Sequence, residues 1–143
     1  MRIPTLILAA LLALVPAAGR AEVTVVPDPD KWIEQALKDI TEGRTDEFSR
    51  SFLTMIDKPE MYDNFSKQMA TLARIRPSFV EKVSDVKYGT AIREVIYLAL
   101  YERTQYAYFR FTVKKNVGGW LISNFDFKGE PAQAFPKGFL QPQ

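Results

Sequence analysis

The stretch Ile92–Phe127, IREVIYLALYERTQYAYFRFTVKKNVGGWLISNFDF, decides the fold of this chain. Along it, apolar side chains alternate with polar or tyrosine side chains at the period of two that is typical of half-buried strands. The alternation predicts strands over Ile92–Glu102, Tyr106–Lys115 and Trp120–Lys128, with turn-like residues between them. Because these connections are short, we expect neighbouring strands of an antiparallel sheet.

The turns of this region set the expected register. Asn116-Val117-Gly118 predicts a three-residue hairpin loop with Gly118 in the left-handed conformation. That loop places Val113 opposite Leu121, Phe111 opposite Ser123 and Phe109 opposite Phe125. A loop of about four residues around Arg103 and Thr104 places Leu98 opposite Phe109. A weaker first strand is expected within Val83–Thr90.

The register divides the predicted sheet into two faces. The face expected to pack against helices carries Ile96, Leu98, Leu100, Phe109, Phe111, Val113, Leu121, Phe125 and Phe127. The opposite face carries Tyr97, Tyr101, Tyr106, Tyr108, Arg110, Thr112, Trp120, Ile122, Asn124 and Asp126. A slip of one residue in any strand would exchange its two faces.

The chain before Pro77 shows helical spacing instead of alternation. Asp28-Pro29 predicts the start of a first helix and Gly43 its end. Thr45 is expected to cap a second helix, and Asp57 begins a pattern resembling a capping box at the start of a third. The sequence therefore predicts an α+β fold, with N-terminal helices on one face of an antiparallel sheet of three to four strands.

Residues 1–21 are predicted to be a secretory signal peptide. Arg2 precedes an apolar run, Ile3–Val15, and small residues lead to a cleavage site after Ala21. This run of 13 residues is too short to span a bilayer, which takes about 20. We therefore expect a periplasmic or secreted protein with no stable membrane anchor after cleavage. It would have one domain at 22–128 and a proline-containing tail at 129–143, either an extended arm or a loosely ordered end.

Composition excludes several classes of function. Removal of Arg2 and Arg20 from the 19 basic residues leaves as many basic as acidic residues, 17 of each, so nothing favours a nucleic-acid partner. The absence of cysteine excludes disulfides, thiolate metal sites and a lipoprotein anchor. Because no phosphate loop, nucleophile motif or carboxylate-histidine spacing is found, we expect no cofactor and no metal.

Two segments carry a resemblance to a known family. Leu37–Asp46, LKDITEGRTD, has a glycine before an acidic residue near the end of the first helix, and Gly119–Phe127, GWLISNFDF, has a Gly-Trp that enters the last strand. With the order of helices before long strands, they resemble the nuclear transport factor 2-like superfamily. The resemblance implies a cone, in which a curved sheet wraps around helices and a pocket lies between them. It also implies frequent dimerisation through the outer face of the sheet.

The cone would have an apolar pocket. The residues expected to line it are Trp32, Phe65, Met69, Phe109, Phe111, Ser123 and Phe125. Enzymes of this superfamily, such as ketosteroid isomerase, scytalone dehydratase and limonene epoxide hydrolase, place acids, histidines, tyrosines or an arginine inside the cone. Here the inward positions are nearly all aliphatic or phenylalanine, and the chain has no histidine. A small ligand would therefore be apolar, and no catalytic residue is assigned.

Two hypotheses about function follow. The first, which we prefer, is an exported non-enzymatic binding or interaction module that contacts a second copy or another protein through Tyr97, Tyr101, Tyr106, Tyr108, Arg110 and Trp120. The alternative is a small cofactor-independent isomerase, dehydratase or hydrolase using Arg110, Asp126, Tyr108 and Asn124, with Tyr108 opposite Asp126. In the expected register these four residues point outward, where a surface ion pair is a sufficient explanation.

Overall fold

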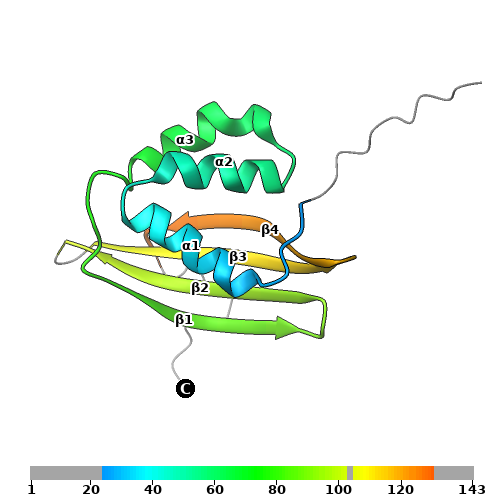
Figure 1. Ribbon diagram of the computed structural model, residues 1–143. Helices are drawn as coiled ribbons and strands as arrows, with labels where there is room; N and C mark the ends of the chain where they lie inside the picture. The colour runs from blue at the N-terminus through cyan, green and yellow to red at the C-terminus, as the bar shows by residue number, and fades with distance from the viewer. Residues whose placement is uncertain (1–23, 103–104, 131–143) are drawn as a thin grey trace, which may run out of the picture.

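Three helices lie on one face of a four-stranded antiparallel sheet in a computed structural model of the chain (Figure 1). The structure describes residues 24–102 and 105–130. The predicted signal peptide and positions 131–143 of the predicted tail lie outside the described residues. The elements are α1 (Pro29–Thr41), α2 (Thr45–Met55), a 3-10 turn (Pro59–Met61), α3 (Tyr62–Ala70), β1 (Phe79–Tyr88), β2 (Ile92–Tyr101), β3 (Gln105–Asn116) and β4 (Gly119–Lys128). The predicted α+β fold class is confirmed.

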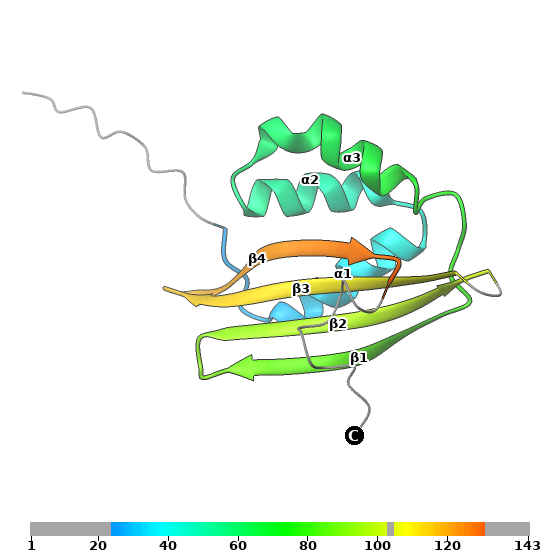
Figure 2. The same cartoon turned by 180° about the vertical axis from the view of Figure 1, so that it is seen from behind.

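The sheet is a meander in which each strand pairs with the next along the chain, in the order β1-β2-β3-β4. It is curved and does not close (Figure 2). Both views show all three helices on the same side of it. We call the side that the helices cover the inner face and the opposite side the outer face.

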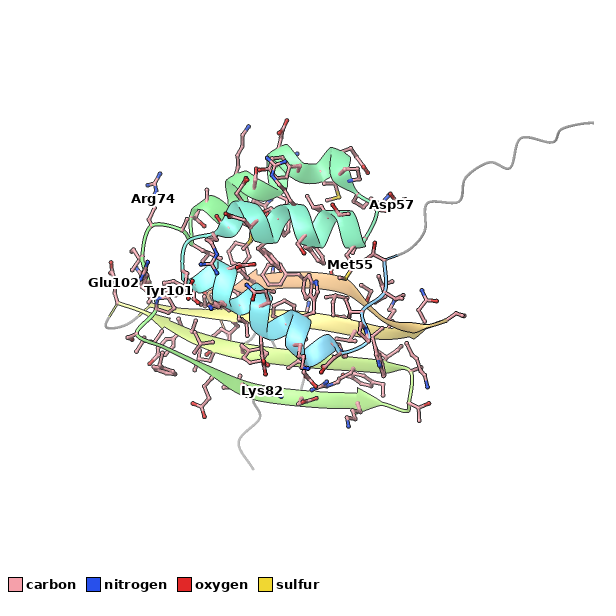
Figure 3. The ribbon with its side chains drawn as sticks, viewed as in Figure 1. Met55, Asp57, Arg74, Lys82, Tyr101 and Glu102 are labelled. Atoms are coloured by element: carbon pink, nitrogen blue, oxygen red, sulfur yellow. The ribbon has the colours of Figure 1, made fainter. Side chains whose placement is uncertain are left out.

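The helix boundaries follow local backbone chemistry. Asp28 caps α1, because its Oδ1 accepts hydrogen bonds from the backbone N–H groups of Asp30 and Lys31 at 3.1 and 3.2 Å. Pro29 occupies the first turn, as predicted. The predicted capping box at Asp57 is wrong: Asp57 follows the end of α2 (Figure 3) with φ 55°, and the 3-10 turn leads into α3. Helix α3 ends at Ala70, well before Pro77.

An aromatic core joins the helices to the sheet, and Phe125 of β4 lies at its centre. The Phe125 ring centroid lies 4.8 Å from that of Phe48 on α2 and 5.0 Å from that of Phe111 on β3. Phe52 and Phe65 bring α2 and α3 onto the same ring. Tilted and edge-on arrangements of this kind are favourable for aromatic pairs.

The predicted register of the last hairpin is wrong. Asn116 pairs with Gly119, so the turn holds two residues, and Gly118 adopts the left-handed conformation at φ 84°. Further along, Val113 lies opposite Ile122 and Thr112 opposite Asn124, which leaves Ser123 as an extra residue in a bulge. The Ser123 hydroxyl donates to the Thr112 carbonyl at 3.2 Å. As a result, Phe111 faces Phe125 and Phe109 faces Phe127.

The predicted faces of β2 are also wrong, because Leu98 lies opposite Tyr108 and not opposite Phe109. Three residues connect Tyr101 to Gln105, where a four-residue loop was predicted, and a change of one residue exchanges the faces of the strand. The inner-face residues of β2 are Arg93, Val95, Tyr97, Ala99 and Tyr101, and the outer-face residues include Ile96, Leu98 and Leu100. On β4 the bulge turns Trp120 and Ile122 to the inner face.

The central position of Phe125 predicts a large effect of truncation. We expect Phe125→Ala to lower the free energy of unfolding by about 3–5 kcal/mol, because the cavity would open between two helices and the sheet. Chemical denaturation of dilute protein measures this change. Phe79→Ala is the matched control, because Phe79 is 42% exposed on the outer face and its truncation should cost about 0.5 kcal/mol. Equal losses in the two variants would contradict the aromatic core.

Candidate functional site

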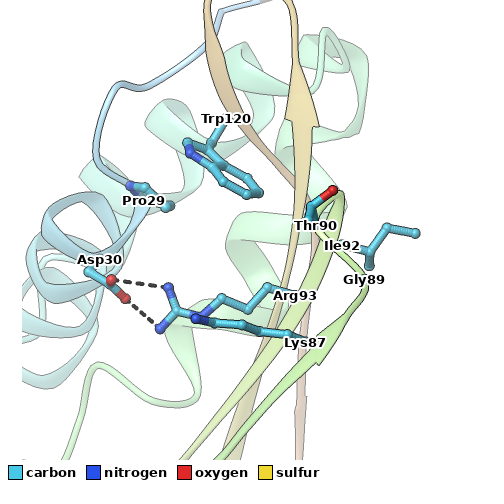
Figure 4. A pocket seen from close by; sticks show the side chains of 8 residues that line it. All are labelled: Pro29, Asp30, Lys87, Gly89, Thr90, Ile92, Arg93 and Trp120. Atoms are coloured by element: carbon cyan, nitrogen blue, oxygen red, sulfur yellow. Dashed lines mark hydrogen bonds and ion pairs between the residues drawn. The ribbon is translucent and has the colours of Figure 1, made fainter.

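A pocket of about 400 Å³ opens at one end of the inner face (Figure 4). It lies between the first turn of α1, the hairpin that joins β1 to β2, and the start of β4. The lining residues are Pro29, Asp30, Lys87, Gly89, Thr90, Ile92, Arg93 and Trp120. Segments far apart in the sequence therefore build one concave site.

Arg93 is part of the wall of the pocket, and its guanidinium forms ion pairs with two carboxylates. Its Nε and Nη2 donate to the Asp85 carboxylate at 2.7 and 2.6 Å, and its Nη1 donates to Asp30 Oδ2 at 3.0 Å. Asp30 Oδ1 is buried and lies 2.9 Å from Arg93 Nη2 without an aligned hydrogen bond, so this contact is an ion pair. Arg93 thereby ties the first turn of α1 to β1, and its guanidinium has little hydrogen-bonding capacity left.

The ion pairs also shift the ionisation of these groups. The hydrogen bonds from Arg93 lower the pKa of Asp85 from 3.8 to about 2. The two carboxylates in turn raise the pKa of Arg93. Asp85 thus stays ionised through the whole range of neutral and mildly acidic pH.

Lys87 and Trp120 complete the pocket. Lys87 lies directly opposite Arg93 on the neighbouring strand, and within the described ranges it makes no ion pair. Two backbone hydrogen bonds fix the position of Trp120. Its N–H donates to the Val26 carbonyl at 2.8 Å, and its carbonyl accepts from the Val26 N–H at 2.7 Å. The neighbouring Gly119 permits this approach, since a Cβ there would lie 2.8 Å from the Val26 carbonyl oxygen.

The residues of the alternative catalytic hypothesis lie on the outer face. Arg110 Nη2 lies 3.3 Å from Asp126 Oδ2, and the two residues are directly opposite each other. The predicted pairing of Tyr108 with Asp126 is wrong, because Tyr108 lies opposite Lys128. Asn124 lies opposite Thr112. The four residues share a face, but none of them lines the pocket at the start of α1.

The predicted partner-contact residues divide between the two faces. Tyr106, Tyr108 and Arg110 lie on the outer face, as predicted, since they alternate with the buried inner-face residues of β3. The predicted outward position of Tyr97, Tyr101 and Trp120 is wrong: all three pack with the core of the inner face. Burial raises the pKa of Tyr101 to about 12, and its hydroxyl has no hydrogen-bond partner among the residues that the structure describes.

The residues predicted to line an apolar pocket belong mostly to the aromatic core. Met69, Phe109 and Phe111 are fully buried, and Trp32, Phe65 and Phe125 pack against the same cluster. Ser123 occupies the bulge of β4. A ligand cavity among these residues stays a prediction.

Sequence reasoning did not single out Arg93, Lys87, Asp30 or Asp85. Arg93 interrupts the mostly apolar strand β2, which was a usable signal, but the expected register placed the faces of β2 the wrong way round. The contact of Arg93 with Asp30 joins residues 63 positions apart. No local pattern reports such a contact.

Two further kinds of site are not found. In the part of the chain that the structure describes, no group of acidic residues could hold a metal ion. Nor does any helix within residues 24–102 or 105–130 have the length and apolarity to cross a membrane.

Known proteins do not identify the chain, since no family model, curated protein or solved structure matched it in the comparisons.

The Arg93 ion pairs predict a loss of stability on substitution. We expect Arg93→Gln to lower the free energy of unfolding by about 2 kcal/mol at pH 7, because it leaves two carboxylates facing each other. Arg50→Gln is the control, since its ion pair with Asp46 is 3.1 Å long but both side chains are mostly exposed, and exposed pairs contribute about 0–1 kcal/mol. Denaturation curves of both variants measure the difference. A similar loss of unfolding free energy in the two variants would show that the Arg93 ion pairs stabilise the protein no more than an exposed pair.

The lowered pKa of Asp85 predicts a dependence of stability on pH. Its folded pKa of about 2 lies below the ordinary 3.8, so the stabilisation is complete above pH 4 and is lost as the pH falls from about 4 to about 2. Thermal unfolding at a series of pH values measures this loss. In Arg93→Gln the dependence over the same range should shrink. An unchanged acid dependence in that variant would contradict the assignment to this ion pair.

Proposed function

We propose that the protein is an exported, non-enzymatic binding module that forms a two-fold homodimer through the outer face of its sheet. The observation that carries the proposal is the apolar character of this face, although no described helix covers it. Its exposed large apolar side chains are Phe79, Tyr88, Ile92 and Tyr106, at 39–49% exposure. Aromatic residues exposed in this way are typical of interfaces.

The apolar residues form rows across the strands. Phe79, Leu100 and Tyr106 lie opposite one another at one end of the sheet, and Tyr88 lies opposite Ile92 at the other. Between them, Leu98 lies opposite Tyr108. Facing sheets pack through such rows, since side chains from the two sheets interdigitate.

Charge complementarity favours a second copy as the occupant. The β1–β2 half of the outer face carries Glu81 and Glu94, whereas the β3–β4 half carries Arg110, Lys114 and Lys128 beside Asp126. A two-fold axis parallel to the strands, in the plane between two facing sheets, would lay the acidic half of each copy over the basic half of the other. The alternative axis across the strands would lay like charges on like, so we propose the first.

The size of the face fits a dimer of moderate affinity. Four strands about 4.8 Å apart and about ten residues long give a face of roughly 600 Å². Stable interfaces bury about 800 Å² per partner. We therefore expect a dimer that dissociates on dilution.

A non-enzymatic role is supported by the position of the polar cluster that the alternative hypothesis requires. Arg110 and Asp126 pair with each other on the outer face, and neither of them lines the pocket at the start of α1. Export and membership of the nuclear transport factor 2-like superfamily stay predictions from the sequence.

Sedimentation of the purified protein tests the dimer. At tens of micromolar we expect the mass of two chains, and dilution should shift it toward one. A strict monomer would overturn the proposal. A full chain that is monomeric, together with a dimer of the chain shortened after Glu130, would instead assign the face to residues 131–143.

Charge reversal tests the proposed axis. Glu81 on β1 and Lys128 on β4 lie at the two ends of one row of paired residues across the sheet. The proposed axis turns this row end over end, so Glu81 of one copy lies over Lys128 of the other. Glu81→Lys and Lys128→Glu should each weaken dimerisation about tenfold, since each contact occurs twice, and the double reversal should restore it. Lys67→Glu on α3 is the control and should have no effect. Failure of the double variant to recover would exclude this axis.

A further inference from the structure

We propose that the pocket between α1 and the β1–β2 hairpin binds a small organic anion that carries one negative charge and an apolar or aromatic body. The pocket lies on the inner face, and apart from Ile92 its lining residues are not among those of the proposed dimer contact on the outer face. Its volume of about 400 Å³ is within the range of small-molecule sites, about 300–1,000 Å³. Figure 4 shows the lining side chains around one open space.

The sign of the ligand charge follows from the ion pairs of the site. Arg93 has its charge offset by Asp30 and Asp85, which it contacts at 2.6–3.0 Å. Lys87 is the remaining cation, and it lies directly opposite Arg93. Within the described residues Lys87 makes no ion pair, so its ammonium is the charged group of the lining that is left to bind a ligand. A single anion would pair with this ammonium, whereas a cation would be repelled by it.

The walls on either side of Lys87 fit the rest of such a ligand. Trp120 presents an indole ring to the pocket, and Pro29 adds apolar surface (Figure 4). Thr90 contributes a hydroxyl group that can donate a hydrogen bond to a carboxylate. An aromatic or short aliphatic body would therefore lie against Trp120 while its carboxylate binds at Lys87.

The site is preorganised, because hydrogen bonds fix the positions of the residues that form its walls. Two backbone hydrogen bonds to Val26 hold Trp120, and the two carboxylates hold Arg93. The N–H groups at the start of α1 do not contribute, since Asp28 already accepts from those of Asp30 and Lys31. Lys87 is thus the main determinant of charge selectivity.

Fluorescence titration with phenylacetate and with the neutral phenylacetamide tests the proposal. The chain has two tryptophans, so Trp32→Phe leaves Trp120 as the reporter within the pocket. We expect saturable quenching by phenylacetate and weaker binding of the amide. Lys87→Gln should weaken phenylacetate binding about tenfold, the effect of one charge-assisted hydrogen bond, and leave the amide unchanged. Lys67→Gln, on α3 and among neither the pocket residues nor those of the outer face, is the matched control.

If Trp32→Phe does not fold, calorimetric titration measures the binding of both probes to the chain without that substitution. Preference for the anion together with its loss in Lys87→Gln supports the site. Binding of neither probe, equal binding of both, or an unchanged affinity in Lys87→Gln would overturn it. Because the sheet dimer does not enter these measurements, failure here leaves the proposed homodimer to its own test.

Discussion

The structure depends on one constraint: three helices are enough to cover only one face of the sheet. The residues of β2, β3 and β4 that meet the helices are therefore mostly apolar, and Phe125 illustrates the result, since its ring contacts side chains from α2, α3 and β3. The other face remains outside this core. Its mixture of aromatic, aliphatic and charged side chains is what a surface needs for contact without forming a second core.

The sequence predicted the elements better than it predicted their pairing. Strand β3 alternates cleanly, so Phe109 and Phe111 were assigned correctly to the inner face and Arg110 to the outer face. Strand β2 has apolar residues on both sides, as Val95 and Ile96 are both fully buried. Periodicity cannot orient such a strand, and a loop that is one residue shorter than expected then exchanged its faces.

The pocket was less predictable than the fold, for a related reason. Its parts come from the start of α1, the β1–β2 hairpin and the start of β4, and only the tertiary structure brings them together. Asp30 lies in the first turn of α1, where an acidic residue is favourable in itself, but the same carboxylate also pairs with Arg93. When a residue type already fits its place in a helix or strand, the sequence gives no sign that its side chain also makes a contact with a distant segment.

The bulge at Ser123 has a consequence for how chains of this fold can vary in length. Because one extra residue separates Ile122 from Asn124, the first part of β4 is out of phase with its second part. Removal of Ser123 would leave a regular strand in which Ile122 still lies opposite Val113 and Trp120 opposite Lys115, so both halves of β4 would keep their faces. The bulge thus absorbs one extra residue locally, and neither Trp120 in the pocket nor Phe125 in the core depends on its presence.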